Sequence, residues 1–188
     1  MLVLTVQKES VVQMIKSGMY YPNFWLSEFS CMTTRFTEAY KYLKDALSKK
    51  IGKSYLESDF CMWGWVANPF VFFHTVQVDW QNMVALFLDI PEDEMVFSDY
   101  DVFTSYVWGE SNDGNFVIED FPEAVQEVDK RCVQCVFDTI RPSDIVYEVN
   151  LGSLLEGREV DKAYTVNDLY IKGILVEEFK RLKQLSKA

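Results

Sequence analysis

The residue best suited to catalysis is Glu148, which lies in the segment IVYEVN at 145–150. The spacing of this segment is typical of a strand, so Glu148 shares one face with Val146 and Asn150. If that face meets solvent, Glu148 is an ordinary surface acid, because charged side chains are seldom buried without a partner. If the face lines a cleft, the carboxylate can act as a general acid or base, or stabilise a positive charge. The sequence leaves both interpretations open.

The segment CMWGWVANPFVFFH at 61–74 concentrates aromatic rings and ends in the single His of the chain. Trp63 and Trp65 are two residues apart, so in a strand both indoles lie on one face. They can fill a core, or they can form a wall on which a ring-bearing ligand stacks. His74 lies in an apolar run, where a lone His is more often a hydrogen-bonded core residue than a general base.

Cys132 and Cys135 have the C-x-x-C spacing that can hold zinc or support redox chemistry. A zinc site needs about four ligands, and only Cys61 and His74 could complete this one. Both Cys also fit the apolar stripe of a helix predicted over 120–136. We therefore predict reduced, buried thiols and no metal.

The segment SDYD at 98–101 offers a pair of carboxylates, Asp99 and Asp101, that could bind a metal or act together in catalysis. The same residues fit the start of a helix, with Ser98 as the N-cap and Asp101 in the place of the capping-box Glu. The capping interpretation is preferred because it accounts for both positions. The sequence has no nucleophile-elbow motif and no phosphate-binding glycine loop.

The hydrophobic pattern predicts the elements that must position these residues. Strands are expected at 2–6, 60–66, 70–78, 83–90 and 145–151, and helices near 11–18, 36–51, 98–107, 120–136 and the C-terminal end. In the first helix, Val11, Met14 and Ile15 should form the apolar face. No linker or repeat divides the chain. The sequence predicts one α+β domain over residues 1–188, with a central, mostly antiparallel sheet and surrounding helices.

Composition predicts a soluble protein with an acidic surface. The net charge of −11 over 188 residues opposes direct binding to nucleic-acid backbones and to anionic membranes. No apolar run approaches the roughly 18 residues that a membrane span needs. Met1 leads into LVLTVQ without a basic region or a cleavage site, so we expect no signal peptide and a cytoplasmic location.

Short motifs follow one another in a recognisable order between residue 5 and about 150. They are Thr5-Val6-Gln7, Gly18-Met19-Tyr20, Ala39-Tyr40-Lys41-Tyr42-Leu43, Trp63-Gly64-Trp65, Asp89-Ile90-Pro91, Ser98-Asp99-Tyr100-Asp101 and Tyr147-Glu148-Val149. In this order they resemble a bacterial and phage domain-of-unknown-function family, number thirty-eight forty-one. That family usually has Trp where this chain has Tyr42 and Tyr147. The resemblance implies a small bacterial or phage protein and carries no activity with it.

The first strand, the following helix, the G-x-Y motif and a late strand with one Glu are also similar to the ADP-ribosyltransferase-like fold. This similarity implies NAD bound as a substrate in a cleft, with its nicotinamide ring stacked on Trp63 and Trp65. It implies that Glu148 stabilises the ribosyl oxocarbenium ion by accepting a hydrogen bond from a ribose hydroxyl. Thr5 and Gln7 would contact the nicotinamide or the ribose.

Three functions therefore stay open, with either a nucleotide-like small molecule or a protein as the partner. One is an NAD-using transferase in which Gln7, Trp63, Trp65 and Glu148 meet in a cleft. Another is a non-catalytic interaction protein, such as a phage-borne inhibitor or toxin-system partner, with an acidic and aromatic surface. The third is a small-molecule sensor without chemistry. A pocket of roughly 300 Å³ or more, lined by those residues, would favour the first or the third.

Overall fold

The computed structural model describes residues 1–18, 20, 22, 34–52, 60–67, 80–118, 132–156 and 165–185. The strands are β1 (Leu2–Lys8), β2 (Met62–Ala67), β3 (Met83–Asp89), β4 (Met95–Asp99), β5 (Val117–Ile118), β6 (Val133–Phe137) and β7 (Ile145–Asn150). The α-helices are α1 (Glu9–Lys16), α2 (Thr34–Ile51), α3 (Tyr100–Val107), α5 (Leu151–Leu154) and α6 (Thr165–Leu185). Short 3-10 turns span Trp80–Asn82, Glu92–Glu94 and Pro142–Asp144. The predicted α+β fold class is confirmed.

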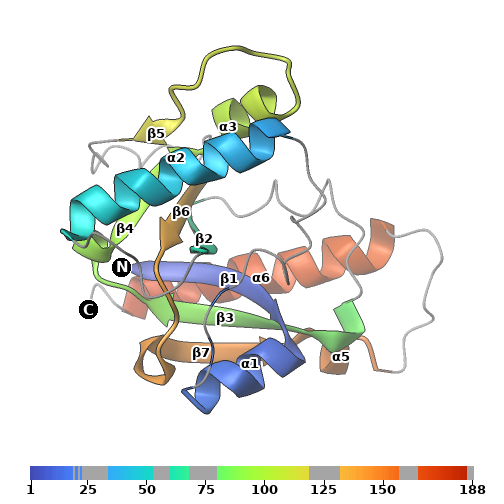
Figure 1. The fold of residues 1–188 in the computed structure, drawn as a ribbon. Helices are drawn as coiled ribbons and strands as arrows, with labels where there is room; N and C mark the ends of the chain where they lie inside the picture. The colour runs from blue at the N-terminus through green and yellow to red at the C-terminus, as the bar shows by residue number, and fades with distance from the viewer. Residues whose placement is uncertain are drawn as a thin grey trace.

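The strands form one 7-stranded sheet in the order β5-β4-β6-β2-β1-β3-β7. Each neighbouring pair in this order is antiparallel. The first strand of the chain lies inside the sheet, where Leu4 is opposite Trp65 of β2 on one side and Phe87 of β3 on the other. In Figure 1, β4 and β6 run steeply while β1, β3 and β7 run nearly level, so the sheet is strongly twisted.

One face of the sheet packs against α1, and we call it the α1 face. Val12 and Ile15 of α1 enter a buried cluster with side chains from β1, β2, β3, β4 and β6. The strand residues of this cluster include Val3, Met62, Val66, Val84, Leu86, Leu88, Met95, Phe97, Val133, Cys135 and Phe137. Of the predicted apolar positions in α1, Ile15 is confirmed, but Met14 is 46% exposed and Val12 is buried in its place.

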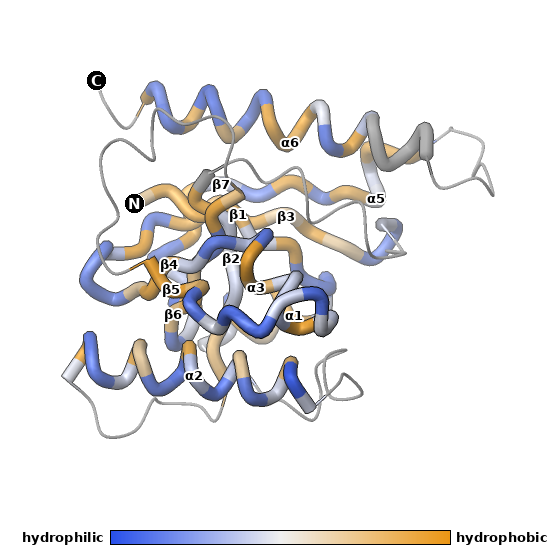
Figure 2. Tube along the Cα trace, turned by 90° about the horizontal axis from the view of Figure 1, so that it is seen from above, coloured by the Kyte–Doolittle hydropathy of each residue, from blue (hydrophilic) through white to orange (hydrophobic). Residues whose placement is uncertain are grey.

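The other face, which we call the helix-covered face, is divided between two clusters. Leu4, Trp65 and Phe87 pack against α6 through Ile171, Leu175 and Phe179. Val96 and Val136 pack against α2 and α3 through Phe36, Ala39, Leu43, Leu47, Phe103 and Val107. Seen from above, α6 and α2 run along opposite sides of the molecule with the strands between them (Figure 2). The predicted inward side of the C-terminal helix and the stripe of α2 are both confirmed.

Two predictions about local structure are wrong. Residues 133–137 form the strand β6 and not the end of a helix, and their side chains, four of them apolar and one Gln134, are buried on both faces of the sheet. The N-cap of α3 is Asp99 and not Ser98: the Asp99 carboxylate accepts from the backbone N–H groups of Asp101 and Val102. Residues 68–79, which include His74 and the predicted strand at 70–78, lie outside the described residues, as do 119–131.

Gly64 of β2 lies where the neighbouring strand β1 leaves no room for a side chain, and a stability prediction follows. A Cβ added at Gly64 would overlap Val3 Cγ1 and would lie 3.2 Å from Leu4 O, and both Val3 and Leu4 are fully buried. We expect Gly64→Ala to lower the free energy of unfolding by about 1–3 kcal/mol, measured by urea denaturation.

Gly173 of α6 is the matched control, since a Cβ there meets nothing within 4 Å. Because Ala favours a helix interior more than Gly does, Gly173→Ala should raise stability by up to ~1 kcal/mol. Equal effects of the two substitutions would contradict the packing described for Gly64.

Candidate functional site

Glu148 lies on β7, an edge strand of the described sheet, and its side chain is 43% exposed. Its cross-strand partner is Leu86, so it is on the α1 face. The carboxylate is 2.7 Å from Lys16 Nζ at the end of α1. An exposed ion pair of this kind contributes at most about 1 kcal/mol. Glu148 is thus a paired surface acid at the edge of the sheet.

Thr5 and Gln7 of β1 lie on the same face as Glu148. Thr5 is opposite Leu86, and Leu86 is opposite Glu148, so Thr5 and Glu148 are separated by two strand spacings, or roughly 10 Å. Gln7 Nε2 donates to Thr5 Oγ1 at 2.8 Å, and Thr5 is only 3% exposed. This pair satisfies a buried hydroxyl, which leaves Thr5 little freedom to meet a ligand.

Trp63 and Trp65 share a face of β2 as predicted, but it is the helix-covered face. Trp65 is buried, and its ring centroid is 5.0 Å from that of Tyr100. The Trp63 ring is 5.2 Å from Phe103 and 5.7 Å from Tyr40. Protein rings thus already pack against both indoles.

The structure does not bring the predicted site residues together in one cleft. The sheet separates Thr5, Gln7 and Glu148 from Trp63 and Trp65, because side chains on opposite faces of a strand cannot meet. Gln7 and Glu148 therefore lie on a different face of the sheet from Trp63 and Trp65, and the NAD-transferase function stays a prediction.

Cys132 and Cys135 are buried, but they too lie on opposite sides of the sheet. Cys132 belongs to the cluster under α6 and Cys135 to the cluster on the α1 face, so the two sulfurs cannot hold one metal. Burial raises the pKa of the Cys61 thiol to about 12, and it also raises the pKa of Cys135 above its ordinary value. These thiols are neutral at physiological pH. Among the described residues no group of three or more His, Cys, Asp or Glu is placed to hold a metal.

Beneath the start of α3, the helix-covered face contains unpaired polar atoms. Ser98 of β4 is directly opposite Gln134 of β6, and both are at most 2% exposed. Ser98 Oγ, Gln134 Nε2 and the nearby Trp63 Nε1 have no hydrogen-bond partner in the described part of the chain. Buried polar groups of this kind lower stability unless a water or another group satisfies them.

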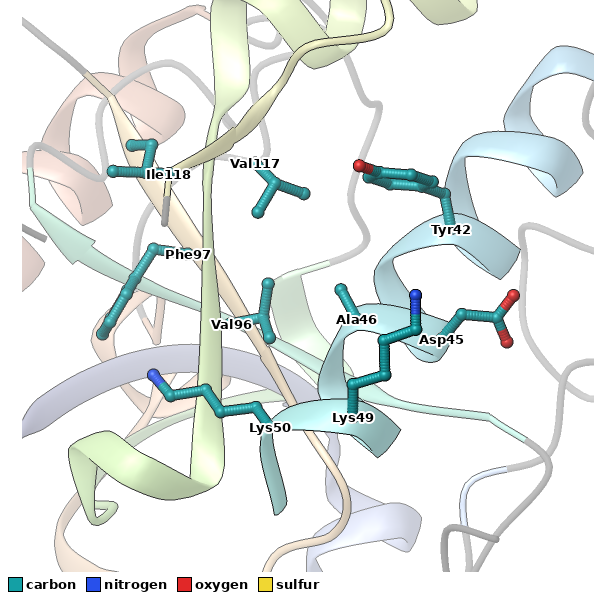
Figure 3. Close-up of a pocket in the computed structure, with 9 residues that line it drawn as sticks. All are labelled: Tyr42, Asp45, Ala46, Lys49, Lys50, Val96, Phe97, Val117 and Ile118. Carbon is teal, nitrogen blue, oxygen red and sulfur yellow. The ribbon is translucent and has the colours of Figure 1, made fainter. Parts of the chain in front are cut away.

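A pocket with a volume of about 470 Å³ lies between α2 and the sheet edge formed by β4 and β5 (Figure 3). Its described lining residues are Tyr42, Asp45, Ala46, Lys49, Lys50, Val96, Phe97, Val117 and Ile118. The side chains of Val96 and Val117 form one wall and the C-terminal half of α2 forms the other, while the side chains of Phe97 and Ile118 lie on the opposite side of the two strands. The volume is within the usual 300–1,000 Å³ range of small-molecule sites.

Some polar groups that line this pocket already contact other parts of the protein, and others point toward or away from the pocket. Lys50 Nζ donates to Glu92 O at 3.0 Å and lies 5.3 Å from the Phe97 ring centroid. The Asp45 carboxylate points away from the pocket, whereas the Tyr42 hydroxyl points across it toward Val117 (Figure 3). The Tyr42 phenol and the Lys49 ammonium thus remain without a hydrogen-bond partner that the structure describes, at the edge of the pocket.

Sequence reasoning predicted α2 but did not find this pocket. The apolar stripe of α2 was visible in the sequence, yet the pocket uses the margin of that stripe together with β5, a strand of two residues. The sequence feature that could have indicated this pocket is the basic pair Lys49-Lys50 in an acidic chain, two helical turns from Tyr42, which the structure shows to be exposed.

Comparisons of the chain with protein-family models, with curated proteins and with solved structures gave no match. The resemblances noted from the motifs therefore stay predictions, and function is argued from the geometry. Within the described ranges, no helix combines the length and the apolarity that crossing a membrane requires.

The Ser98 hydroxyl has no partner in the described part of the chain, so its removal should change the stability of the protein. Because Ser98→Ala removes a buried polar group without a partner, we expect the free energy of unfolding to rise by ~1 kcal/mol in urea denaturation. Ser17→Ala is the control, since the Ser17 hydroxyl donates to Met14 O at 2.7 Å and its loss should be neutral or slightly destabilising. A clear loss of stability in Ser98→Ala would instead indicate that ordered water satisfies this hydroxyl.

Proposed function

We propose that this chain is a non-catalytic binding protein that holds a small amphipathic ligand in the pocket between α2 and the β4–β5 edge. The observation that supports this proposal is the pocket itself, with a volume of about 470 Å³ and an apolar wall. Pockets with mostly apolar walls and a few polar groups are the usual form of small-molecule sites.

The described lining of the pocket shows no nucleophile paired with a base. Its described lining residues include no Ser, Cys or His, and the Asp45 carboxylate points outward. A nucleophile with an adjacent base is the usual signature of a hydrolase or transferase site. A binding function without chemistry fits this set of residues better.

A protein partner is the second candidate, and a specific observation favours it. Trp108 at the end of α3 is 58% exposed and Tyr42 is 54% exposed. The ring of Tyr42 contacts the buried ring of Phe116, and Phe116 in turn contacts Tyr106, so ring contacts link the exposed Tyr42 to α3. Aromatic side chains are enriched at protein interfaces, and the net charge of −11 would favour a basic partner.

The transferase hypothesis can be tested directly with NAD. Since Glu148 is paired with Lys16 and is separated by the sheet from both Trp residues, we expect no NAD-dependent rise in the thermal unfolding temperature. Glu148→Gln should behave like the parent chain in the same thermal-shift assay. A stabilisation by NAD that disappears in Glu148→Gln would revive the transferase hypothesis.

The pocket can be tested with 1-octanol, a neutral probe with an apolar tail. In a ¹H–¹⁵N NMR titration, we expect the largest shifts at Val96, Val117 and Ile118, which line the pocket. Ala46→Trp should reduce this response strongly, because the indole would fill the cavity.

Lys41→Trp is the matched control, since Lys41 is an exposed residue of the same helix that does not line the pocket. Circular dichroism checks that both variants fold, and Val117→Phe is a second pocket-filling variant. Shifts that are equal in the parent, Ala46→Trp and Lys41→Trp would overturn the proposed site.

A further inference from the structure

We infer that the ligand of this pocket carries a single carboxylate, which Lys49 and Tyr42 bind while an apolar body lies against Val96 and Val117. This inference rests on the proposed binding function and specifies the chemical class of the ligand. The ligand class is therefore a small amphipathic carboxylate.

The local charge around the pocket is opposite to that of the chain. Over Thr34–Ile51, helix α2 has five basic and two acidic side chains, a net charge of +3, whereas the whole chain has −11. These positive charges lie on the helix that forms one wall of the pocket, and Lys49 and Lys50 outnumber Asp45 among its described lining residues. This balance favours an anionic over a cationic ligand.

Lys49 and Lys50 are the cations among the described lining residues, and of these two Lys49 is the one available to a ligand. Arg35 donates to Tyr106 O, Ser111 O and Asn112 Oδ1 and so holds the loop after α3. Lys50 is engaged by Glu92 O and by the Phe97 ring.

Lys49 lines the pocket and has no hydrogen bond or ion pair within the described part of the chain, even with Asp45 one helical turn earlier. Its ammonium group remains free to bind an acceptor.

Tyr42 supplies a second donor in a fixed orientation. Its ring packs edge-on against the buried Phe116, with 5.6 Å between centroids and an interplanar angle of 78°. This contact directs the hydroxyl across the pocket (Figure 3). A carboxylate has two oxygens, so one can accept from the ammonium and the other from the phenol in charge-assisted hydrogen bonds.

The small number of cationic groups in the described lining disfavours a ligand with more than one negative charge. A phosphate carries up to two negative charges and is usually bound by several cations or backbone N–H groups. Among the described lining residues, Lys49 is the one ammonium without a partner that the structure describes, which suits a single negative charge better than two. The side chains of Val96 and Val117 match an aliphatic or aromatic body.

Octanoate and 1-octanol form a matched pair of probes, because they share an apolar tail and differ in the head group. By NMR titration, we expect the parent chain to bind octanoate about fivefold more tightly than 1-octanol. Lys49→Gln should abolish the difference in affinity between octanoate and 1-octanol. Tyr42→Phe should weaken octanoate binding by a smaller factor, and Asp45→Asn should strengthen it.

Lys41→Gln is the matched control, because it removes the same charge from α2 at a residue that does not line the pocket. It should weaken octanoate binding much less than Lys49→Gln does. Equal affinities for octanoate and 1-octanol, or equal effects of the two Lys substitutions, would overturn the carboxylate inference and leave the proposed pocket standing. Absence of pocket shifts with either probe would overturn both.

Discussion

The structure depends on one constraint, which is that the central strands of the sheet are buried on both faces. In β1, Val3 belongs to the cluster on the α1 face and Leu4 to the cluster beneath α6, and both are fully buried. Burying both faces requires helices on both sides of the sheet, and α1, α2, α3 and α6 supply them. The close approach of Val3 to Gly64 shows how little space this arrangement leaves between β1 and β2.

The same constraint explains why the central sheet is a poor place for a ligand. Because side chains alternate along a strand, Trp65 points toward α6 and Glu148 lies on the side of α1. The sheet therefore separates residues that the sequence analysis predicted to share one ligand site. The rings of Tyr40, Tyr100 and Phe103 occupy the space around the indoles. The aromatic residues of β2 consequently act as core.

Space for a ligand is instead found where the sheet ends. β5 pairs with β4 only through Val117 and Ile118, and α2 passes alongside this short strand. The helix completes a cavity at that edge and contributes Lys49 and Tyr42 to its mouth. The exposed lining residues of α2, Tyr42, Asp45 and Lys49, lie outside the buried clusters, so they can vary without disturbing the two-sided core.

The sequence by itself determined the α+β class, the strand β1, the helix α2 and the inward side of α6, because these follow from local hydrophobic periodicity. It did not determine β6, since the mostly apolar segment VQCVF is compatible with a buried helix or a buried strand. Only the tertiary structure decided that Glu148 and the Trp pair lie on opposite faces and that Lys49, Tyr42 and Val117 share a pocket. The physical reason is that strand order and register bring distant residues together, and local periodicity contains no information about either.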